Sequence, residues 1–346
     1  MKIGIMTGGG DCPGLNAVIR AVVRKSDTLS SRVVGLRNGW KGLLDPSTMD
    51  LDGKMVSGIL HIGGTIIGTS RTNPFKDPGA PEMVLKNIRI LGLDALIAVG
   101  GEDTLGAAAK FYEMGLPVVG VPKTIDNDLS GTDFTFGFDT AVSTATDAID
   151  RLHTTAESHN RVMVVEVMGR HAGWIATYSG IAGGADVILV PEIPINLDEV
   201  CDLILRRHSR GKSYSIVVVA EGAQFAEKPG TDGELVLQEG KKDEFGHVRL
   251  GGISQVLAKA IEKRTKFETR FAVLGHIQRG GSPTAYDRVL ATRFGVFATE
   301  MVHRGEFGKM AALQGNKILA VPLAEATSKL KTVDMDLYGI AREFFG

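Results

Sequence analysis

The sequence predicts an α/β fold in which helices cover both faces of largely parallel sheets. The first observation is that short apolar runs, typical of buried strands, alternate with longer segments of helical periodicity. The second is that many of the 44 glycines stand in pairs or triplets directly after apolar runs, as turns at strand ends do. With 346 residues, 43% of them hydrophobic, the chain suits two domains of ordinary size or one large unit.

Each element follows from its local pattern along the chain. Short apolar runs bounded by turn residues predict strands at 2–7, 33–36, 94–99, 117–121, 162–167, 187–190, 216–220 and 270–274. Apolar residues at helical spacing predict helices at 14–27, 80–90, 104–113, 138–153, from 173 onward, and at 197–209, 252–263 and 284–302. Pro-Gly and Asp-Gly pairs beside a charged run predict an exposed hairpin or excursion at 226–248.

Composition excludes several classes of partner. The net charge is −1, so no bulk attraction to nucleic acid or to an anionic membrane is expected. Cys12 and Cys201 are far apart and lack metal-type spacing, which argues against a disulfide framework and for a reducing compartment. The first strand begins at residue 2, and no stretch approaches the ~18 to 20 apolar residues of a membrane helix. We therefore expect a cytoplasmic protein.

Two acidic segments carry most of the chemical information. Gly100–Thr104 and Pro122–Asp128 each follow a predicted strand directly. In an open parallel sheet, residues just past the carboxyl ends of strands line the ligand crevice. The groups that this crevice would hold are Glu102, Asp103, Lys123, Asp126 and Asp128. Such a concentration of charge on turns after buried strands indicates that the site handles a cation or transfers a proton.

The first glycine-rich loop, Thr7–Asn16, joins a strand to a helix and can seat a phosphate on its backbone amides. It is not a Walker loop, because Leu15 and Asn16 replace the Lys-Ser/Thr pair. It also departs from the dinucleotide fingerprint, since Pro13 stands where the third glycine would be. Arg71, in a later polar turn, adds a cation that matters only if it converges with this loop.

Further arginines stand at the ends of predicted strands. Arg161 precedes the strand at 162–167 and Arg170 follows it, while Arg270 opens a later strand that Arg279 follows. Guanidinium forks suit bidentate recognition of phosphate. A single histidine such as His276 is more often structural than a general base.

Together these residues form an inventory for phosphoryl transfer, which needs neutralised charge, a magnesium site and a base that orients the acceptor hydroxyl. Asp126 is the candidate base, and Glu102 and Asp128 are candidate Mg²⁺ ligands. The groups available to stabilise the transferred phosphoryl group are Arg71, Arg170 and the amides near Gly10.

The chain resembles the 6-phosphofructokinases of the bacterial type from residue 1 to about residue 302. The segments that carry the resemblance are Thr7–Asn16, Arg71, Gly100–Thr104, Thr124–Asp128, Met168–Gly173, Glu221-Gly222 and Gly275–Pro283. The resemblance implies that Asp126 takes the proton of the sugar 1-hydroxyl and that Mg²⁺ is the cofactor. The residues implied to bind fructose 6-phosphate are Thr124, Asp126, Met168, Gly169, Arg170, Glu221, His276 and Arg279.

The resemblance also implies an assembly. Arg161 and Arg270 are implied to grip the 6-phosphate bound by a neighbouring subunit, so a homodimer or homotetramer would share its active sites across an interface.

The fold of this family is two doubly wound domains with the active site in the cleft between them. The implied division assigns 1–137 with 277–327 to a phosphoryl-donor domain, and 138–276 with 328–346 to a fructose 6-phosphate domain.

Two positions depart from the ATP-using members of the family. Asp103 stands where those carry the second small residue of a Gly-Gly-Asp-Gly pattern, and Lys123 where they usually carry glycine before Thr-Ile-Asp. A carboxylate at Asp103 would add negative charge where the α-phosphate and ribose of ATP lie, at a cost on the order of a few kcal/mol. Lys123 would instead bind the end of a shorter anion. Both changes resemble the pyrophosphate-dependent branch, which implies a reversible transfer with Gly10, Arg71, Asp103 and Lys123 at the donor.

Two alternatives stay open at this stage. In the first, Asp103 and Lys123 form a local salt bridge and the enzyme accepts ATP. In the second, the chain is a non-catalytic sugar-phosphate sensor. A sensor predicts a damaged catalytic set, whereas Asp126, Asp128 and the arginines are all present.

Regulation is weakly indicated. Basic residues of the effector site in bacterial ATP-dependent relatives match Arg20, Arg24, Arg210 and Lys212. However, His153, Gly58 and Tyr214 stand where that site has an arginine, an acid and a histidine. We therefore expect no strong control by ADP or phosphoenolpyruvate, and we assign no role to 226–248 or to the chain after about residue 305.

Overall fold

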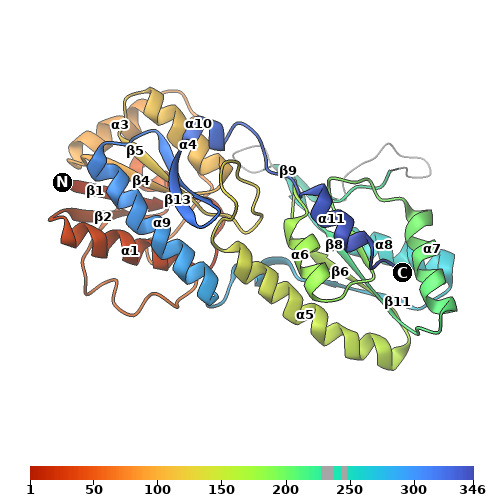
Figure 1. Cartoon of the computed structure of the whole chain (residues 1–346). Coiled ribbons are helices and arrows are strands. Elements are labelled where there is room, and N and C mark those ends of the chain that lie inside the picture. The colour runs from red at the N-terminus through yellow and green to blue at the C-terminus, as the bar shows by residue number, and fades with distance from the viewer. Residues whose placement is uncertain (227–236, 243–247) are drawn as a thin grey trace. The chain divides into compact units, whose positions relative to one another are not determined.

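The computed structural model describes residues 1–226, 237–242 and 248–346, which fall into two compact units (Figure 1). Unit 1 comprises Met1–Thr140 and Arg279–Leu330, and unit 2 comprises Ala141–Lys242, Val248–Gln278 and Lys331–Gly346. These limits lie within a few residues of the division implied by the resemblance. The assignment of a substrate to each unit stays a prediction.

Unit 1 is built on a seven-stranded sheet in the order β13-β12-β5-β4-β1-β2-β3. Its strands are β1 (Lys2–Thr7), β2 (Arg32–Leu36), β3 (Thr48–Leu51), β4 (Ala95–Gly100), β5 (Val118–Pro122), β12 (Lys309–Gln314) and β13 (Lys317–Pro322). The five inner strands run parallel, and the edge strands β3 and β13 pair antiparallel with their neighbours. The carboxyl ends of β1, β4 and β5 therefore meet at one edge of the sheet.

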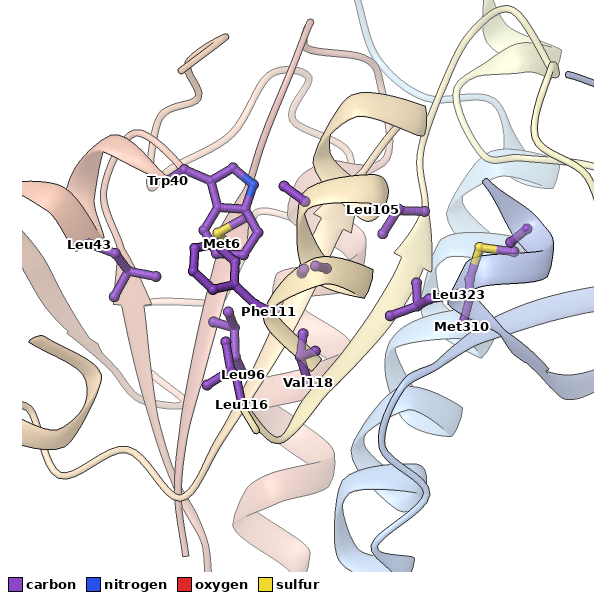
Figure 2. Close-up of a cluster of buried hydrophobic side chains, with 14 of the residues drawn as sticks. Met6, Trp40, Leu43, Leu96, Leu105, Phe111, Leu116, Val118, Met310 and Leu323 are labelled. Carbon is purple, nitrogen blue, oxygen red and sulfur yellow. The ribbon is translucent and has the colours of Figure 1, made fainter. Parts of the chain in front are cut away.

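Helices cover this sheet through large apolar side chains. They are α1 (Leu15–Thr28), α2 (Lys41–Leu44), α3 (Ala80–Ile90), α4 (Glu102–Glu113), α9 (Ala285–Arg304) and α10 (Leu323–Ala326). Figure 2 shows Phe111 of α4 beside Trp40 and against Leu96 and Val118 of the sheet; the two ring centroids lie 4.8 Å apart. This buried cluster holds α4 on the sheet and so fixes where its N-terminus lies.

Unit 2 has a four-stranded, fully parallel sheet in the order β11-β6-β8-β7. Its strands are β6 (Val162–Val167), β7 (Val187–Leu189), β8 (Ser215–Ala220) and β11 (Thr269–Val273). Its helices are α6 (Trp174–Ala182), α7 (Leu197–Ser209), α8 (Ile253–Thr265) and α11 (Met335–Arg342), with α5 (Phe138–His159) leading in from unit 1 and the 3₁₀ turn η1 (Gly275–Arg279) leading back. Every residue of β6 and β8 is buried, as expected for central parallel strands.

The fold class is confirmed, since both main sheets are largely parallel and the helices alternate with the strands. One boundary was wrong in a way that matters. The helix expected at 104–113 begins at Glu102, so Glu102 and Asp103 lie in its first turn rather than on a glycine-rich turn. The helix expected to end near residue 153 continues to His159. Short elements that were not predicted are α2, β3, β12, β13, α10 and α11.

The segment 226–248 is described only in part. Within it and just beyond, β9 (Leu237–Lys242) and β10 (Val248–Leu250) form a separate antiparallel pair, in keeping with the expected hairpin. Residues 227–236 and 243–247 lie outside the described part of the chain. No helix in the described ranges is long and apolar enough to cross a membrane.

Candidate active site

The glycine-rich loop after β1 gathers two cations against its backbone. Lys123, which directly follows β5, donates a hydrogen bond from Nζ to the carbonyl oxygen of Gly10. Arg279 donates from Nη1 to the carbonyl oxygen of Asp11 at 3.3 Å. A side chain at Gly10 would displace the guanidinium group of Arg279, because a Cβ there would lie 2.6 Å from its Nη1. The fold thus brings together Gly10, Lys123 and Arg279, three of the residues selected from the sequence.

Lys123 is unusual for a lysine because only 3% of it is exposed. Burial lowers its pKa, since a cation removed from water is disfavoured. A buried ammonium group is stabilised by an anion that completes its hydrogen bonds. Its position on the glycine loop therefore suits the binding of a small anion there.

The loop that carries Arg71 is attached to the same glycine loop. Gly9 donates from its backbone N to the carbonyl oxygen of Ser70 at 2.9 Å, and Thr69 donates from Oγ1 to the carbonyl oxygen of Gly9 at 2.7 Å. The side chain of Arg71 itself is exposed. Because the two residues before Arg71 bind the glycine loop, the backbone at Arg71 lies close to that loop, and the role of its side chain stays a prediction.

Helix α4 begins directly against this loop. A Cβ on Gly8 would lie 2.6 Å from Thr104 Oγ1, so the glycine allows the close approach. Glu102 and Asp103 occupy the first turn of α4, where the positive end of the helix dipole stabilises carboxylates. Asp103 is thus an anion already placed where a helix would otherwise attract a phosphate.

The segment after β5 alternates in burial. Thr124, Asp126 and Asp128 are half-buried, whereas Ile125 and the other residues between them are buried. Asp126 donates from its backbone N to Thr124 Oγ1 at 3.0 Å, and its carboxylate oxygen Oδ1 is shielded from solvent without a hydrogen-bond partner among the described residues. A carboxylate oxygen without a partner is available to accept a proton.

Asp128 has a strongly perturbed titration. Its pKa is raised to about 7, chiefly by burial and next by the negative charge of Asp126, with a smaller contribution from Glu102. The three carboxylates are therefore close enough to interact. Their combined charge, with the unpartnered oxygen of Asp126, fits a hard divalent cation such as Mg²⁺. Within the described ranges no three acidic, histidine or cysteine side chains form a complete metal cage, so phosphate and water would supply the other ligands.

Unit 2 holds a cavity of about 70 Å³ at the carboxyl ends of its strands. Met168, Glu221 and His276, all selected from the sequence as sugar ligands, line it. Gly169 and Arg170 follow Met168 directly, and Gly222 donates from its backbone N to the carbonyl oxygen of Gly169 at 3.0 Å. Cavities that enclose a whole ligand are several hundred Å³ in size, so this one is too small to hold a sugar phosphate by itself.

Sequence reasoning missed the residue that joins two walls of this cavity. Gln278 is fully buried, accepts a hydrogen bond from the backbone N of Met168 at 3.2 Å, and donates to the carbonyl oxygen of Gly275 at 3.1 Å. The sequence did not indicate that Gln278 is buried, because glutamine is common on exposed surfaces.

Arg161 and Arg270 lie away from this cavity. Arg161 precedes β6, while the cavity residues follow it, and a strand of that length spans about 20 Å. Both arginines pair instead with Glu268, Arg161 at 2.8 Å. The hydrogen bond from Arg161 and the charges of both arginines lower the pKa of Glu268. Within one chain, the fold does not bring these two arginines to the other sugar ligands.

Two of the residues considered for an effector site, His153 and Tyr214, contact each other. His153 lies with Nε2 2.6 Å from the carbonyl oxygen of Gly183 and with Nδ1 3.3 Å from the hydroxyl of Tyr214. Arg207 pairs with Asp186 at 2.9 Å. This arrangement is compatible with the expectation of weak effector control, which stays a prediction.

Comparison with known proteins follows the same lines. Residues 2–302 match the sequence profile of the family described as phosphofructokinase. A pyrophosphate–fructose 6-phosphate 1-phosphotransferase of Streptomyces coelicolor is 58% identical over the full length of both chains. An ATP-dependent 6-phosphofructokinase of Mycobacterium tuberculosis is 54% identical, again over the full length of both. The crystal structure of a pyrophosphate-dependent phosphofructokinase from Marinobacter aquaeolei superposes with a TM-score of 0.82 at 25% identity, covering 97% of this chain and 86% of that one.

Proposed function

The chain belongs to the phosphofructokinase family, and from that premise we propose that it transfers a phosphoryl group from pyrophosphate to the 1-hydroxyl of fructose 6-phosphate. The products are fructose 1,6-bisphosphate and orthophosphate, and the reaction runs readily in both directions. The observation that carries the choice of donor is the buried ammonium group of Lys123 on the carbonyl oxygen of Gly10.

Two relatives of nearly equal similarity carry names with different donors, so overall identity separates them little. The donor is instead argued from charge. Lys123 supplies a cation beside the glycine loop for a short, highly charged anion. Asp103 places a carboxylate at the start of α4. The α-phosphate of ATP would have to bind at this helix start, where the carboxylate repels it. Together they favour pyrophosphate and disfavour ATP.

In the proposed reaction, Asp126 accepts the proton of the sugar 1-hydroxyl. The hydroxyl oxygen forms a bond to the nearer phosphorus of pyrophosphate, the bridging P–O bond breaks, and orthophosphate leaves. Arg71, Arg170 and Lys123 balance the charge of the transferred group. Glu102 and Asp128 would hold Mg²⁺, which when bound neutralises pyrophosphate oxygens.

For the sugar, we propose binding by Met168, Gly169, Glu221 and His276 of unit 2, whose cavity supports that role. The resemblance adds Thr124, Asp126, Arg170 and Arg279 to the proposed sugar ligands.

Arg161 and Arg270 are proposed to bind the 6-phosphate of a neighbouring subunit in a homodimer or homotetramer. Two facts support this: both arginines pair with Glu268 and do not line the cavity of their own chain, and Phe271 beside Arg270 is 44% exposed. Exposed apolar side chains on an edge strand fit a surface that another subunit covers.

We also place the reaction in the cytoplasm. Both cysteines are buried free thiols, which suits a reducing compartment.

A purified-enzyme assay tests the proposal. At saturating fructose 6-phosphate and Mg²⁺, we expect turnover with pyrophosphate and little with ATP. Turnover with ATP and none with pyrophosphate would favour an ATP-dependent 6-phosphofructokinase, the alternative that the Mycobacterium tuberculosis relative brings forward. No turnover with either donor, together with tight binding of the sugar phosphate, would point to the sensor.

A further inference from the structure

Asn127 occupies the position between the proposed base and a proposed metal ligand. Its backbone φ is 51°, in the left-handed region that few residues other than glycine adopt. Its side chain is fully buried, although asparagine is usually exposed. A buried polar residue in this rare backbone conformation persists only where the surrounding structure requires it. Here that residue lies between the two proposed functional carboxylates.

The side chain of Asn127 joins the acidic segment to the chain that returns beside it. Its Oδ1 accepts a hydrogen bond from the backbone N of Thr135 at 3.1 Å, and its Nδ2 donates to the carbonyl oxygen of Asp133 at 3.3 Å. Thr135 in turn donates from Oγ1 to the carbonyl oxygen of Thr124 at 2.7 Å. Residues 124–135 therefore form a loop closed on itself through buried groups.

The backbone at Asn127 also determines how the neighbouring side chains alternate. Ile125, Asn127 and Leu129 are buried, whereas Asp126 and Asp128 are half-buried. The left-handed residue sets the direction of the chain between the two aspartates. A residue that avoids this conformation would turn one carboxylate relative to the other.

We propose that Asn127 is a positioning residue that fixes Asp126 and Asp128 relative to each other, through its left-handed backbone and its hydrogen bonds to 133 and 135. The inference rests on the proposed function, because the relative position of Asp126 and Asp128 matters only if they act as base and metal ligand. Asn127 acts through these two residues and through the loop, without contact with a substrate.

Two variants separate the backbone from the side chain. Asn127→Gly keeps access to positive φ and removes both side-chain hydrogen bonds, whereas Asn127→Ala removes the hydrogen bonds and disfavours the backbone conformation. Ser30→Ala is the matched control, because Ser30 has a φ of 52° and is exposed beyond the C-terminal end of α1, opposite the glycine loop. Ser30→Ala therefore places alanine at a positive φ, as Asn127→Ala does, but at a position outside the proposed site.

The measurements are kcat and KM for fructose 6-phosphate with pyrophosphate, and the thermal midpoint of each variant. We expect Asn127→Ala to lower kcat by about 100-fold with little change in KM, since a misplacement of about 1 Å can have this effect. Asn127→Gly should recover roughly a tenth of wild-type kcat because the backbone is restored. Ser30→Ala should keep wild-type kcat.

Wild-type kcat in Asn127→Ala, or a rise in KM alone, would overturn the inference. If Asn127→Ala does not fold, Asn127→Gly decides: wild-type kcat there overturns it, and lowered kcat at unchanged KM supports it. Asp126→Ser distinguishes a failure of the proposed function from a failure of the proposed role of Asn127. Wild-type activity in Asp126→Ser contradicts the proposed base, whereas an inactive Asp126→Ser beside an active Asn127→Ala contradicts only the role of Asn127.

Discussion

At the scale of single residues, charge selects the phosphoryl donor. Lys123 is buried on the glycine loop and lacks the freedom of a surface lysine, so its ammonium group is a fixed cation. Asp103 lies in the first turn of α4, close to the glycine loop that faces the start of this helix. Pyrophosphate is short enough to bind the ammonium group of Lys123 without reaching the carboxylate of Asp103.

Asp103→Gly should raise kcat/KM for ATP by about tenfold, which corresponds to ~1.4 kcal/mol, because it removes both bulk and like charge. The measurement is steady-state kinetics with each donor at saturating sugar. Asp103→Asn keeps the size and removes the charge, so it separates the two causes. Unchanged exclusion of ATP in Asp103→Gly would contradict the argument.

Lys123→Gly should mainly lower turnover with pyrophosphate, since the fixed cation of the donor site is lost. The same kinetics measure it, with KM for fructose 6-phosphate as the internal control. An equal loss with both donors would show that Lys123 does not discriminate between them.

Asp126→Ser should lower kcat by about 10³-fold while KM for fructose 6-phosphate stays near its wild-type value, as loss of a general base does. Asp147→Asn is a suitable control, because Asp147 forms an exposed pair with Arg151 on α5. Substantial turnover in Asp126→Ser would remove this residue as the base.

Asp287 gives the fold a pH dependence of its own. Burial raises its pKa from 3.8 to about 6, although Thr140 donates to Oδ2 from N and from Oγ1 at 2.8 and 2.6 Å. Between these two pH values the folded state binds more protons than the unfolded state, so stability falls as pH rises through the window. Asp287→Asn should remove a dependence on the order of 2 kcal/mol, measured by urea unfolding at pH 4 and pH 7. Parallel pH profiles of variant and wild type would refute this.

At the scale of elements, helix termini determine where the sites form. The start of α4 lies against the glycine loop, and the start of α8 is held by a buried acid of β6. Glu166 accepts hydrogen bonds from the backbone N of Ser254 at 2.9 Å, from its Oγ at 2.8 Å, and from the backbone N of Gly252. The same residue lines the cavity with Met168 and Glu221. One carboxylate therefore caps a helix and forms part of the wall of this cavity, the proposed sugar site.

Glu166→Gln should lower the free energy of unfolding by about 2 kcal/mol, because an amide offers one acceptor where the carboxylate offers two. KM for fructose 6-phosphate should rise with little change in kcat. Denaturant unfolding and steady-state kinetics measure the two effects. Asn196→Asp, which keeps an acceptor at the N-cap of α7 away from the cavity, should alter neither. An unchanged KM in Glu166→Gln would show that Glu166 caps α8 without affecting sugar binding.

At the scale of the whole molecule, the position of Arg161 and Arg270 bears on assembly. They share Glu268 at the ends of β6 and β11 opposite the cavity, and they flank exposed apolar side chains. If these arginines bind the 6-phosphate as proposed, a second copy of the chain is needed to bring them to a sugar site.

Mixing two inactive variants tests this arrangement. Asp126→Ser and Arg270→Ala should each be poorly active, and mixed oligomers should regain activity in sites that combine the intact residue of each. Random exchange between dimers would restore about a quarter of all sites. Size-exclusion chromatography supplies the assembly state. No recovery in demonstrably mixed oligomers would contradict shared sites.

The sequence by itself determined the long, strongly patterned elements and the order of the loops. The runs that form β1, β4 and β5 were clear, because burial on both faces demands continuous apolar residues. Their carboxyl ends carry the glycine loop and the acidic segments, so parallel topology predicted that these segments lie at one edge of the sheet. The assignment of donor residues came instead from the resemblance to the family. Short elements such as α2 and β3 escaped, because a few residues hold too little periodicity to register.

Only the tertiary structure decided which distant groups meet. Arg279 reaches the carbonyl oxygen of Asp11 across 268 positions in the chain, and Arg161 and Arg270 share Glu268 rather than joining the cavity. Asn127 has a left-handed backbone, and the loop residues Asp133 and Thr135 satisfy its side chain. Local patterns record a residue's own neighbours, whereas these contacts depend on how the packed elements bring remote segments together.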